Sequence, residues 1–306
     1  MVEHLPNKHV MITGLSGFVG SNLQNYLKNT YKIQPLSVRY LPKQKIKIKA
    51  DVLIHLAGKA HDLRKVVDPK DYYDANFELT KQLFDSFLVS DAKLFIFMST
   101  VKAVTDQVKG VLTEEAVPNP VTHYGIAKLQ AEEYILNQEL PVGKRIYILR
   151  PCMIHGPGNK GNLNLLYKLV AKGIPWPLGG FENKRSFLSV ENLCFVIKNL
   201  IEDEKIPSGV YNLADDISLS TKEVISFLGE SLGKKTRILN VNSSLVKAVA
   251  KLGDYLYLPL NSERLQKLTD NYLVSNKKVI MALGKSLPVS SKDGLMKTFK
   301  SFTKNN

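Results

Sequence analysis

Three side chains near the middle of the chain have the types and the spacing for proton transfer to an oxygen atom. Tyr124 and Lys128 stand four residues apart at the start of a segment with helical character, which puts both on one helix face. A phenol has a reference pKa of about 10, and a neighbouring ammonium group favours its ionised form. Thr100, at the end of an apolar run, can hydrogen-bond an oxygen that alternates between alcohol and ketone. The set predicts redox chemistry at such an oxygen, with the pKa of Tyr124 lowered by Lys128.

A glycine-rich turn near the N-terminus predicts where a cofactor binds. The apolar run 10–13 reads as a strand, Gly14, Gly17 and Gly20 follow at intervals of three, and a helix is expected over about 21–29. A dinucleotide pyrophosphate binds to backbone N–H groups at a helix N-terminus, and glycines at this spacing permit its close approach. The turn therefore predicts a dinucleotide site.

The second expected strand, near 33–38, is followed by Arg39 and no acidic residue. An acid at this point would bind the ribose hydroxyls of NAD(H), whereas an arginine accommodates the 2′-phosphate of NADP(H). Arg39 therefore favours NADP(H), with an arginine that only points into solvent as the alternative. The lysine-rich residues 41–49 leave little room for a crossover helix, so an exposed strand or a loop is expected there.

Strands and helices alternate through the rest of the N-terminal half. We expect a helix over 71–89, a buried strand over 94–98 and a helix that begins near Tyr124, with later helices over 161–173, 190–202 and 221–232 and a strand over 209–214. Such alternation predicts an α/β fold, a Rossmann-type doubly wound parallel sheet, with ligands at the carboxyl ends of its strands.

Composition limits the classes of partner. The chain has 306 residues, 42 Lys and Arg against 28 Asp and Glu, and a formal net charge of +14, which favours anionic partners. The lysine run lacks interleaved aromatic residues, so we expect no nucleic-acid binding. Cys152 and Cys194 are far apart and suggest neither a disulfide nor a metal site. The absence of a signal core or a membrane-length apolar run predicts a cytoplasmic protein without an integral membrane segment.

These motifs together resemble the extended short-chain dehydrogenase/reductase family, which includes nucleotide-sugar epimerases, dehydratases and 4-keto reductases. The resemblance rests on the glycine spacing, on Ser99-Thr100 after the apolar strand, on the Tyr124–Lys128 pair, and on the segments 55–58, 149–151, 154–158 and 183–192. It weakens after about residue 235. We expect His155 and His61 to be packed or hydrogen-bonded and not catalytic.

The resemblance implies a role for each residue that matches a family motif. Thr100, Tyr124 and Lys128 would be catalytic. The cofactor-binding residues would be Gly14, Gly17, Phe18, Val19, Gly20, Arg39, Leu56, Ala57, Gly58, Ser99, Tyr124, Lys128 and Pro151. The substrate would contact Asn76, Thr100, Asn162 and Arg185, with Arg185 on the nucleotide diphosphate and the strand 176–178 near the base. No metal is implied.

The resemblance also predicts the layout of the chain. Residues 1–158 would form the dinucleotide-binding domain, with about 186–203 returning to it, and residues 159–306 mostly a substrate domain. Family members often dimerise through the two helices beside the active site, here 71–89 and 122–136, so a homodimer is expected. The apolar segment 245–260, with interspersed lysines, could be a membrane-interfacial helix, but a core or lid element of the substrate domain is the favoured interpretation.

Departures from the family pattern narrow the reaction. Family 4,6-dehydratases carry an acidic pair after the catalytic threonine, where this chain has Val101 and Lys102. Many epimerases carry an acid after the second strand and an asparagine in place of Met153. We therefore predict an NAD(P)-dependent 4-reductase of a UDP-4-keto-6-deoxy-N-acetylhexosamine, as in surface-polysaccharide synthesis. The alternatives are a UDP-hexose 4-epimerase with tightly bound NAD and, in another class, a catalytically silent dinucleotide sensor or scaffold.

Overall fold

A computed structural model describes residues 8–59, 68–159, 161–256 and 261–303. Its centre is a six-stranded, fully parallel sheet in the order β2-β1-β3-β4-β6-β9. The strands are β1 (His9–Thr13), β2 (Lys32–Leu36), β3 (Val52–His55), β4 (Leu94–Met98), β6 (Arg145–Pro151) and β9 (Gly209–Leu213). The predicted Rossmann-type α/β fold is confirmed.

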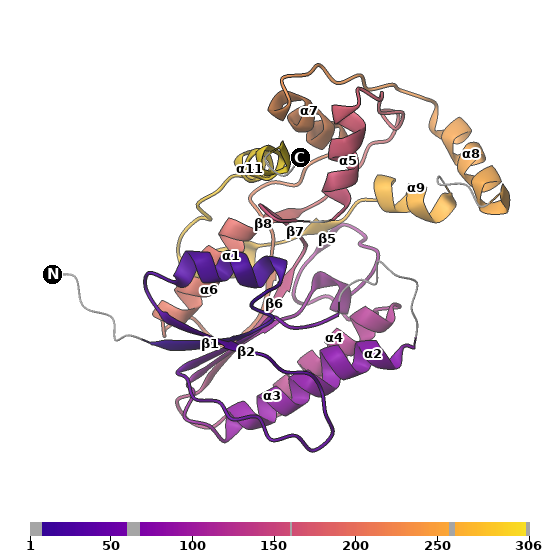
Figure 1. Ribbon diagram of the computed structural model, residues 1–306. Helices are drawn as coiled ribbons and strands as arrows, with labels where there is room; N and C mark the ends of the chain where they lie inside the picture. Colours follow the sequence, from indigo (N-terminus) through magenta and orange to yellow (C-terminus); the bar gives the residue numbers. More distant parts are fainter. Residues whose placement is uncertain (1–7, 60–67, 160, 257–260, 304–306) are drawn as a thin grey trace.

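Helices cover both faces of this sheet (Figure 1). Helices α1 (Phe18–Leu27) and α6 (Val190–Glu202) lie together on one face, and α3 (Leu79–Leu88) and α4 (His123–Leu136) lie on the other. Every side chain of β3 and β4 is buried, as expected for central strands of a parallel sheet that is covered twice. Each large apolar side chain buried in this way contributes about 1.5–3 kcal/mol.

The order of the strands places the binding site. The chain runs from β1 outward to β2 and then returns to β3 on the opposite side of β1, so the direction of winding changes between β1 and β3. Ligands of doubly wound sheets bind at the carboxyl ends of the strands near such a point. Thr13 and His55, the last residues of these two strands, therefore mark the expected site.

Two predicted helices differ in detail, one pair of alternatives is decided, and one predicted strand is wrong. The first helix begins at Phe18, three residues before Ser21. The helix over 71–89 consists of α2 (Lys70–Tyr73), a single π-helical stretch (Asp74–Glu78) and α3. Residues 41–49 form a loop, one of the two expected outcomes. The prediction of a strand over 176–178 was wrong, because this segment makes only isolated bridges, from Trp176 to Ile238 and from Leu178 to Asn240.

The C-terminal part forms a second layer beyond the carboxyl ends of the strands. Helices α5 (Asn162–Ala171), α7 (Thr221–Ser231) and α11 (Ser291–Thr303) enclose a separate apolar cluster (Figure 1). Two short parallel pairs connect the layers: β7 (Met153–His155) with β8 (Phe187–Ser189), and β5 (Val111–Leu112) with β10 (Leu273–Val274). Helix α10 (Lys277–Leu283) packs near β9, and α8 (Ser243–Leu256) and α9 (Ser262–Thr269) extend to one side. The boundary near residue 158 between two domains stays a prediction.

None of the helices that the structure describes is long and apolar enough to cross a membrane.

Candidate active site

The structure brings Thr100 and Tyr124 together. Helix α4 begins after Thr122, whose hydroxyl accepts a hydrogen bond from the Gly125 N–H at 3.2 Å, and this cap places Tyr124 in the first helical turn. Thr100 follows β4, caps a short 3₁₀ turn (Val101–Ala103), and forms a hydrogen bond with the Tyr124 phenol. The strand end and the helix start thus present two hydroxyl groups to one point.

The predicted lowering of the Tyr124 pKa was wrong for the protein alone. Burial raises the pKa of Tyr124 to about 12, although its hydrogen bond with Thr100 acts in the opposite direction. The Lys128 ammonium group is directed elsewhere: its Nζ donates to the Met98 carbonyl oxygen at 2.8 Å and lies 4.5 Å from the centre of the Phe97 ring. The Tyr124 phenol therefore keeps its proton at neutral pH, which suits a proton donor.

Lys128 itself is buried, and burial lowers its pKa to about 7. Glu132, one turn further along α4, raises that pKa by its negative charge. The two effects on the Lys128 pKa oppose each other, and burial is the larger of them.

A buried ion pair holds Glu132 in place. The Arg150 guanidinium donates from Nε to both carboxylate oxygens of Glu132, at 3.1 and 3.0 Å, and from a terminal nitrogen to Oε2. The Ser99 hydroxyl donates to the same carboxylate. Ser99 follows β4 and Arg150 belongs to β6, so this network joins two strand ends to the helix that carries Tyr124 and Lys128.

The glycine turn has the shape that a pyrophosphate requires. Gly14 has φ +69°, and a Cβ there would lie 2.8 Å from the Ala57 backbone nitrogen. A Cβ on Gly20 would overlap the Gly14 carbonyl oxygen. The N-cap of α1 is Gly17, which has no side chain to bind the free N–H groups, and the first turn contains no acid. These features fit the phosphates of a dinucleotide, which would bind at this N-terminus.

A chain of hydrogen bonds connects the glycine turn to the helix beside the site. The Ala57 N–H donates to the Thr13 hydroxyl oxygen at 3.1 Å, and Thr13 contacts His55 Nδ1 at 2.7 Å. His55 Nε2 contacts the Thr80 hydroxyl at 3.0 Å, and Thr80 donates to the Asn76 carbonyl oxygen at 2.8 Å. Since the Thr80 hydroxyl donates its proton to the Asn76 carbonyl oxygen, it accepts from His55 Nε2, and His55 Nδ1 accepts from the Thr13 hydroxyl. Burial, with Lys128 nearby, lowers the His55 pKa and keeps the ring neutral.

The side-chain amide of Asn76 forms its hydrogen bonds with the protein backbone. Its Nδ2 donates to the carbonyl oxygens of Lys59 and Tyr72, both at 3.0 Å, and its Oδ1 accepts from the Lys59 N–H at 3.1 Å. A Cβ on Gly58 would lie 2.6 Å from this Oδ1 and 3.2 Å from Lys128 Nζ. Asn76 therefore packs the 58–59 turn against the catalytic lysine and has only one acceptor site of Oδ1 left for a ligand.

The structure places the largely buried Arg185 beside Asp270 and Tyr272. Its backbone pairs with Leu219 and Tyr272, and burial lowers the pKa of its guanidinium while Asp270 raises it. The ring of Tyr272 lies 5.5 Å from Lys102 Nζ. Arg185 and the turn after Thr100 are thus connected through Tyr272.

The other predicted contacts are spread over three strand ends. Arg39 is exposed, three residues beyond β2, and Leu56 follows β3. Pro151 ends β6.

Two predicted contacts lie at the starts of helices. The side chain of Phe18, in the first turn of α1 with Val19, lies near Gly156 and Gly158. Asn162 opens α5, and His61 lies outside the described residues.

His155 belongs to a different cluster. It is fully buried, its Nδ1 contacts the Thr298 hydroxyl of α11 at 2.9 Å, and its Nε2 lies 3.5 Å from an Asp215 oxygen. Asp215 accepts from the Ser189 N–H and, at 2.6 Å, from Asn192 Nδ2. The expectation of a hydrogen-bonded, packed histidine is confirmed.

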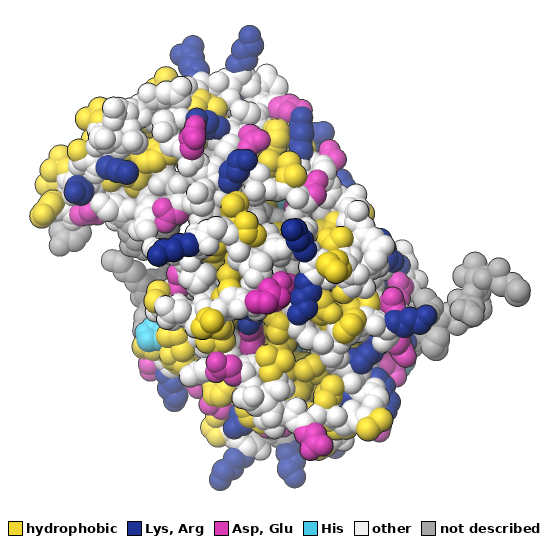
Figure 2. Space-filling model, turned by 180° about the vertical axis from the view of Figure 1, so that it is seen from behind, with side chains coloured by type: hydrophobic (Ala, Val, Ile, Leu, Met, Phe, Trp, Pro, Cys, Tyr) yellow, Lys and Arg dark blue, Asp and Glu magenta, His cyan; other side chains and the backbone are white. Residues whose placement is uncertain are grey.

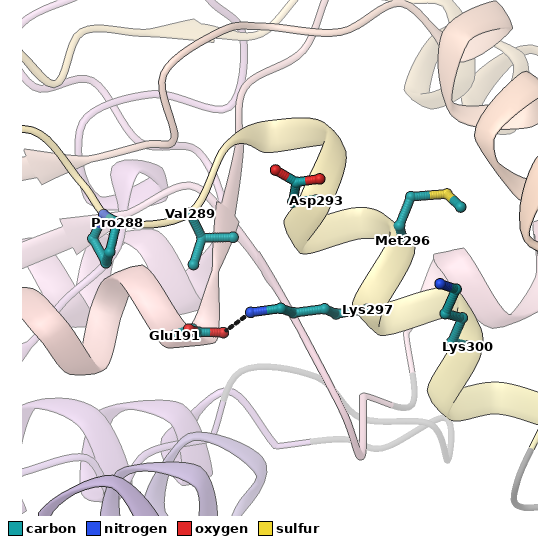
Figure 3. Close-up of a pocket in the computed structure, with 7 residues that line it drawn as sticks. All are labelled: Glu191, Pro288, Val289, Asp293, Met296, Lys297 and Lys300. Atoms are coloured by element: carbon teal, nitrogen blue, oxygen red, sulfur yellow. Dashed lines mark hydrogen bonds and ion pairs between the residues drawn. The ribbon is translucent and has the colours of Figure 1, made fainter.

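A hollow of about 320 Å³ lies between the start of α6 and α11 (Figure 3). It is lined by Glu191, Pro288, Val289, Asp293, Met296, Lys297 and Lys300, and Lys297 crosses it to form an ion pair with Glu191 at 2.7 Å. None of the predicted site residues lines this hollow. The strand ends, and not this surface depression, define the site.

The sequence analysis did not identify two residues of the candidate site, Glu132 and Tyr272. Glu132 could have been found, because it stands four residues after Lys128 and a buried Arg150 at a strand end needs an acidic partner. Tyr272 could not, since it lies beyond the motifs and reaches the site only through the pairing of segments distant in sequence.

Comparison with known proteins identifies the family. The model of the NAD dependent epimerase/dehydratase family matches residues 10–214. The chain belongs to this family. It is therefore an NAD(P)-dependent enzyme of the extended short-chain dehydrogenase/reductase type, which excludes the silent sensor or scaffold.

Curated family members match nearly the whole chain. A UDP-glucose 4-epimerase of Vibrio cholerae is 29% identical and the match covers 98% of this chain and 97% of the relative. An N-acetyl-α-D-glucosaminyl-diphospho-ditrans,octacis-undecaprenol 4-epimerase of Escherichia coli O157:H7 is 28% identical over 89% and 85%. The crystal structure of UDP-glucuronic acid 4-epimerase from Bacillus cereus in complex with NAD has a TM-score of 0.72, 20% identity, and coverage of 97% and 99%. The Bacillus cereus enzyme and this chain therefore share one fold.

Proposed function

We propose that this family member reduces the C4 carbonyl of a UDP-4-keto-6-deoxy-N-acetylhexosamine during the synthesis of a surface polysaccharide. The observation that carries the proposal is the placement of the Tyr124 phenol in the first turn of α4, beside Thr100 at the end of β4, with Lys128 one turn further along the helix. A reductase must supply a proton at the moment the ketone oxygen becomes an alcohol, and a phenol at this position can donate it.

Each residue of the site has a role in this reaction. Thr100 orients the carbonyl oxygen, and Tyr124 donates the proton to it. Lys128, fixed by Met98 and by the 58–59 turn, would hold the ribose hydroxyls of the cofactor. The nicotinamide supplies the hydride when it is bound.

The glycine turn and Arg39 support NADPH as the reductant. The turn leaves the N-terminus of α1 open for the pyrophosphate, and Arg39 is exposed beyond β2, next to β1 in the sheet. A guanidinium at this point can pair with a 2′-phosphate. An enzyme that consumes NADPH must exchange it at each turnover.

The substrate side supports a nucleotide sugar. Arg185 would bind the diphosphate, and Asn162 at the start of α5 would contact the substrate. Lys102 stands where a dehydratase would carry an acid and forms an ion pair with Asp106 at 2.9 Å, so it offers no acid for loss of the C6 hydroxyl. The homodimer and the cytoplasmic location remain part of this proposal.

The second candidate is a 4-epimerase that uses the same residues with hydride transfer out and back. It is favoured by one observation, the match of the Vibrio cholerae UDP-glucose 4-epimerase over nearly the whole chain.

An assay with purified protein separates the two functions. UDP-4-keto-6-deoxy-N-acetylhexosamine is mixed with NADPH or NADH, and cofactor oxidation is followed together with the product. We expect oxidation matched one for one by a UDP-6-deoxyhexosamine. Interconversion of UDP-hexoses at C4 without net cofactor consumption would establish the epimerase and contradict the proposal.

A further inference from the structure

Helix α8 has two apolar faces, and only one of them packs against the protein. Val246, Ala250 and Gly253 are buried. On the other face, Leu245, Val249, Leu252 and Leu256 are exposed by 59%, 46%, 54% and 58%. A helix that only covers a core needs one apolar face, so the second face is available for a partner.

The exposed leucines and valine form a continuous stripe. They follow the spacing i, i+4, i+7 and i+11, which at 3.6 residues per turn keeps them within an arc of about 60°. Tyr255, exposed by 82%, widens the stripe on one side. Single exposed apolar residues are common on soluble proteins, whereas a row of this length marks an interaction surface.

Two exposed lysines, Lys247 and Lys251, lie one turn apart on the same helix. Its acidic residue, Asp254, accepts hydrogen bonds from the Ser262 N–H and hydroxyl at 2.9 and 2.5 Å, so it is occupied at the start of α9. Figure 2 shows hydrophobic side chains beside Lys and Arg side chains on this lobe, at the upper left. At 100° per residue, Lys247 and Lys251 lie about 130–170° around the helix from the centre of the stripe, on a polar face that also carries Asp254, and the chain has a net charge of +14.

We propose that α8 lies in the surface of an anionic lipid bilayer, with the stripe in the acyl region and Lys247 and Lys251 at the headgroups. Amphipathic helices with an apolar face and lysines on the polar face bind membranes in this orientation. Charge favours headgroups over a second copy of the chain, because anionic headgroups neutralise Lys247 and Lys251, whereas a second copy carries the same net positive charge. This surface is independent of the residues proposed for catalysis.

Co-sedimentation with vesicles tests the proposal directly. The protein is mixed with vesicles of phosphatidylcholine alone or of an equimolar mixture with phosphatidylglycerol. We expect binding to the mixed vesicles that salt weakens, and a drop of at least about tenfold in the partition coefficient for L245S/L252S, because each buried leucine contributes about 1.5–3 kcal/mol. K247Q/K251Q should lose about thirtyfold on the mixed vesicles, since each lysine contributes about 1 kcal/mol near an anionic surface.

Matched controls exclude a general loss of structure. V89S/V142S replaces two apolar residues outside α8 that are more exposed than the two leucines, and it should bind vesicles as the parent protein does. Thermal unfolding and turnover of a soluble substrate should be unchanged in L245S/L252S. The proposal is overturned if the parent protein ignores mixed vesicles, if L245S/L252S binds them equally well, or if sedimentation equilibrium shows that the stripe drives self-association without vesicle binding.

Discussion

Two buried polar clusters, each built around one carboxylate, lie near the carboxyl ends of β4, β6 and β9, and they serve different purposes. In the first, Glu132 pairs with Arg150 and Ser99 and lies one helical turn from Lys128. In the second, Asp215 accepts from Ser189 and Asn192 and faces His155. Each carboxylate is buried and satisfied by several donors.

The difference lies in what each carboxylate faces. Glu132 acts on a lysine that borders the site, so its charge sets the charge of Lys128 as well as the packing of α4. Asp215 faces backbone and amide donors of β8 and α6, and its histidine contacts α11, so it joins the C-terminal layer to the sheet. A buried acid is thus functional when its neighbour touches the reacting groups, and structural when its neighbours do not. Five substitutions test or refine this contrast.

The largest effect is expected at the site itself. Tyr124→Phe should lower kcat by about 10³-fold, because general acid catalysis by a positioned side chain contributes about 10²–10⁴-fold. Cofactor binding, followed by fluorescence, and the unfolding temperature should be preserved. Tyr134→Phe, which removes the hydroxyl that donates to Asp85 at 2.6 Å on the outer side of α4, is the matched control. Full turnover by Tyr124→Phe would contradict both candidate reactions.

The first cluster is tested by Glu132→Gln. Loss of one partner from a buried pair leaves the Arg150 charge uncompensated, which should lower the free energy of unfolding by about 3–5 kcal/mol in urea titrations. The Lys128 pKa should fall further, because Glu132 raises it. As the pH is increased, Lys128 should therefore lose its proton, and the enzyme its activity, at a lower pH than in the parent enzyme. Glu133→Gln changes the exposed neighbour on the same helix and should alter neither quantity.

Lys128→Met tests the charge of the lysine through stability. Burial lowers the pKa of Lys128 from 10.5 to about 7, so between these values the unfolded chain binds more protons than the folded one. The free energy of unfolding of the parent protein should therefore gain a component on the order of a few kcal/mol as the pH rises through this window. Lys128→Met should lack that component, whereas Lys81→Met, at a partly exposed position of α3, should retain it. Identical pH profiles for the parent and Lys128→Met would contradict the buried ammonium.

The second cluster should respond in stability alone. Asp215→Asn turns an amide donor toward the Ser189 N–H or Asn192, which should cost about 1–3 kcal/mol of unfolding free energy. We expect kcat to stay within about twofold of the parent value, since Asp215 contacts none of the proposed catalytic groups. Asp91→Asn, at an exposed position, serves as the control. A large fall in kcat with unchanged stability would remove the contrast between the two clusters.

The smallest effect is expected at Arg39. Arg39→Asp should shift the ratio of kcat/KM for NADPH over NADH toward NADH by about tenfold or more, because one charge-assisted contact contributes about 1.5–3 kcal/mol. Lys45→Asp makes the same kind of charge change in the adjacent exposed loop and should leave the ratio unchanged. An unaltered ratio in Arg39→Asp would mean that Arg39 points only into solvent.

The sheet and its glycine turn could be predicted because each signal is local. The apolar runs 52–55 and 94–98 form fully buried strands, and the turn from Gly14 to Gly20 determines its own geometry through backbone contacts. The same holds for Tyr124 and Lys128, which one helix positions by itself.

The remaining features depend on distant segments. The bridge between Arg185 and Tyr272 joins two segments that are far apart in the sequence. No pattern of apolar residues predicts that they pair. The raised pKa of Tyr124 also escaped the sequence, since burial is a property of the assembled layers and the direction of the Lys128 side chain depends on Met98 and Phe97. The strand expected over 176–178 failed because its partners near residues 238–240 offer single bridges and not a ladder.

The central claim is that hydride is delivered to C4 of the sugar while Tyr124 protonates the oxygen, and isotope transfer tests it most directly. Purified enzyme is given UDP-4-keto-6-deoxy-N-acetylhexosamine and NADPH that carries deuterium at nicotinamide C4, and the product is analysed by mass spectrometry and NMR. The account predicts a single deuterium at C4 of a UDP-6-deoxyhexosamine, with the rate of its appearance reduced about 10³-fold in Tyr124→Phe. Unreduced keto sugar with the labelled cofactor unconsumed, together with interconversion at C4 of UDP-hexoses added in a parallel reaction, would contradict it.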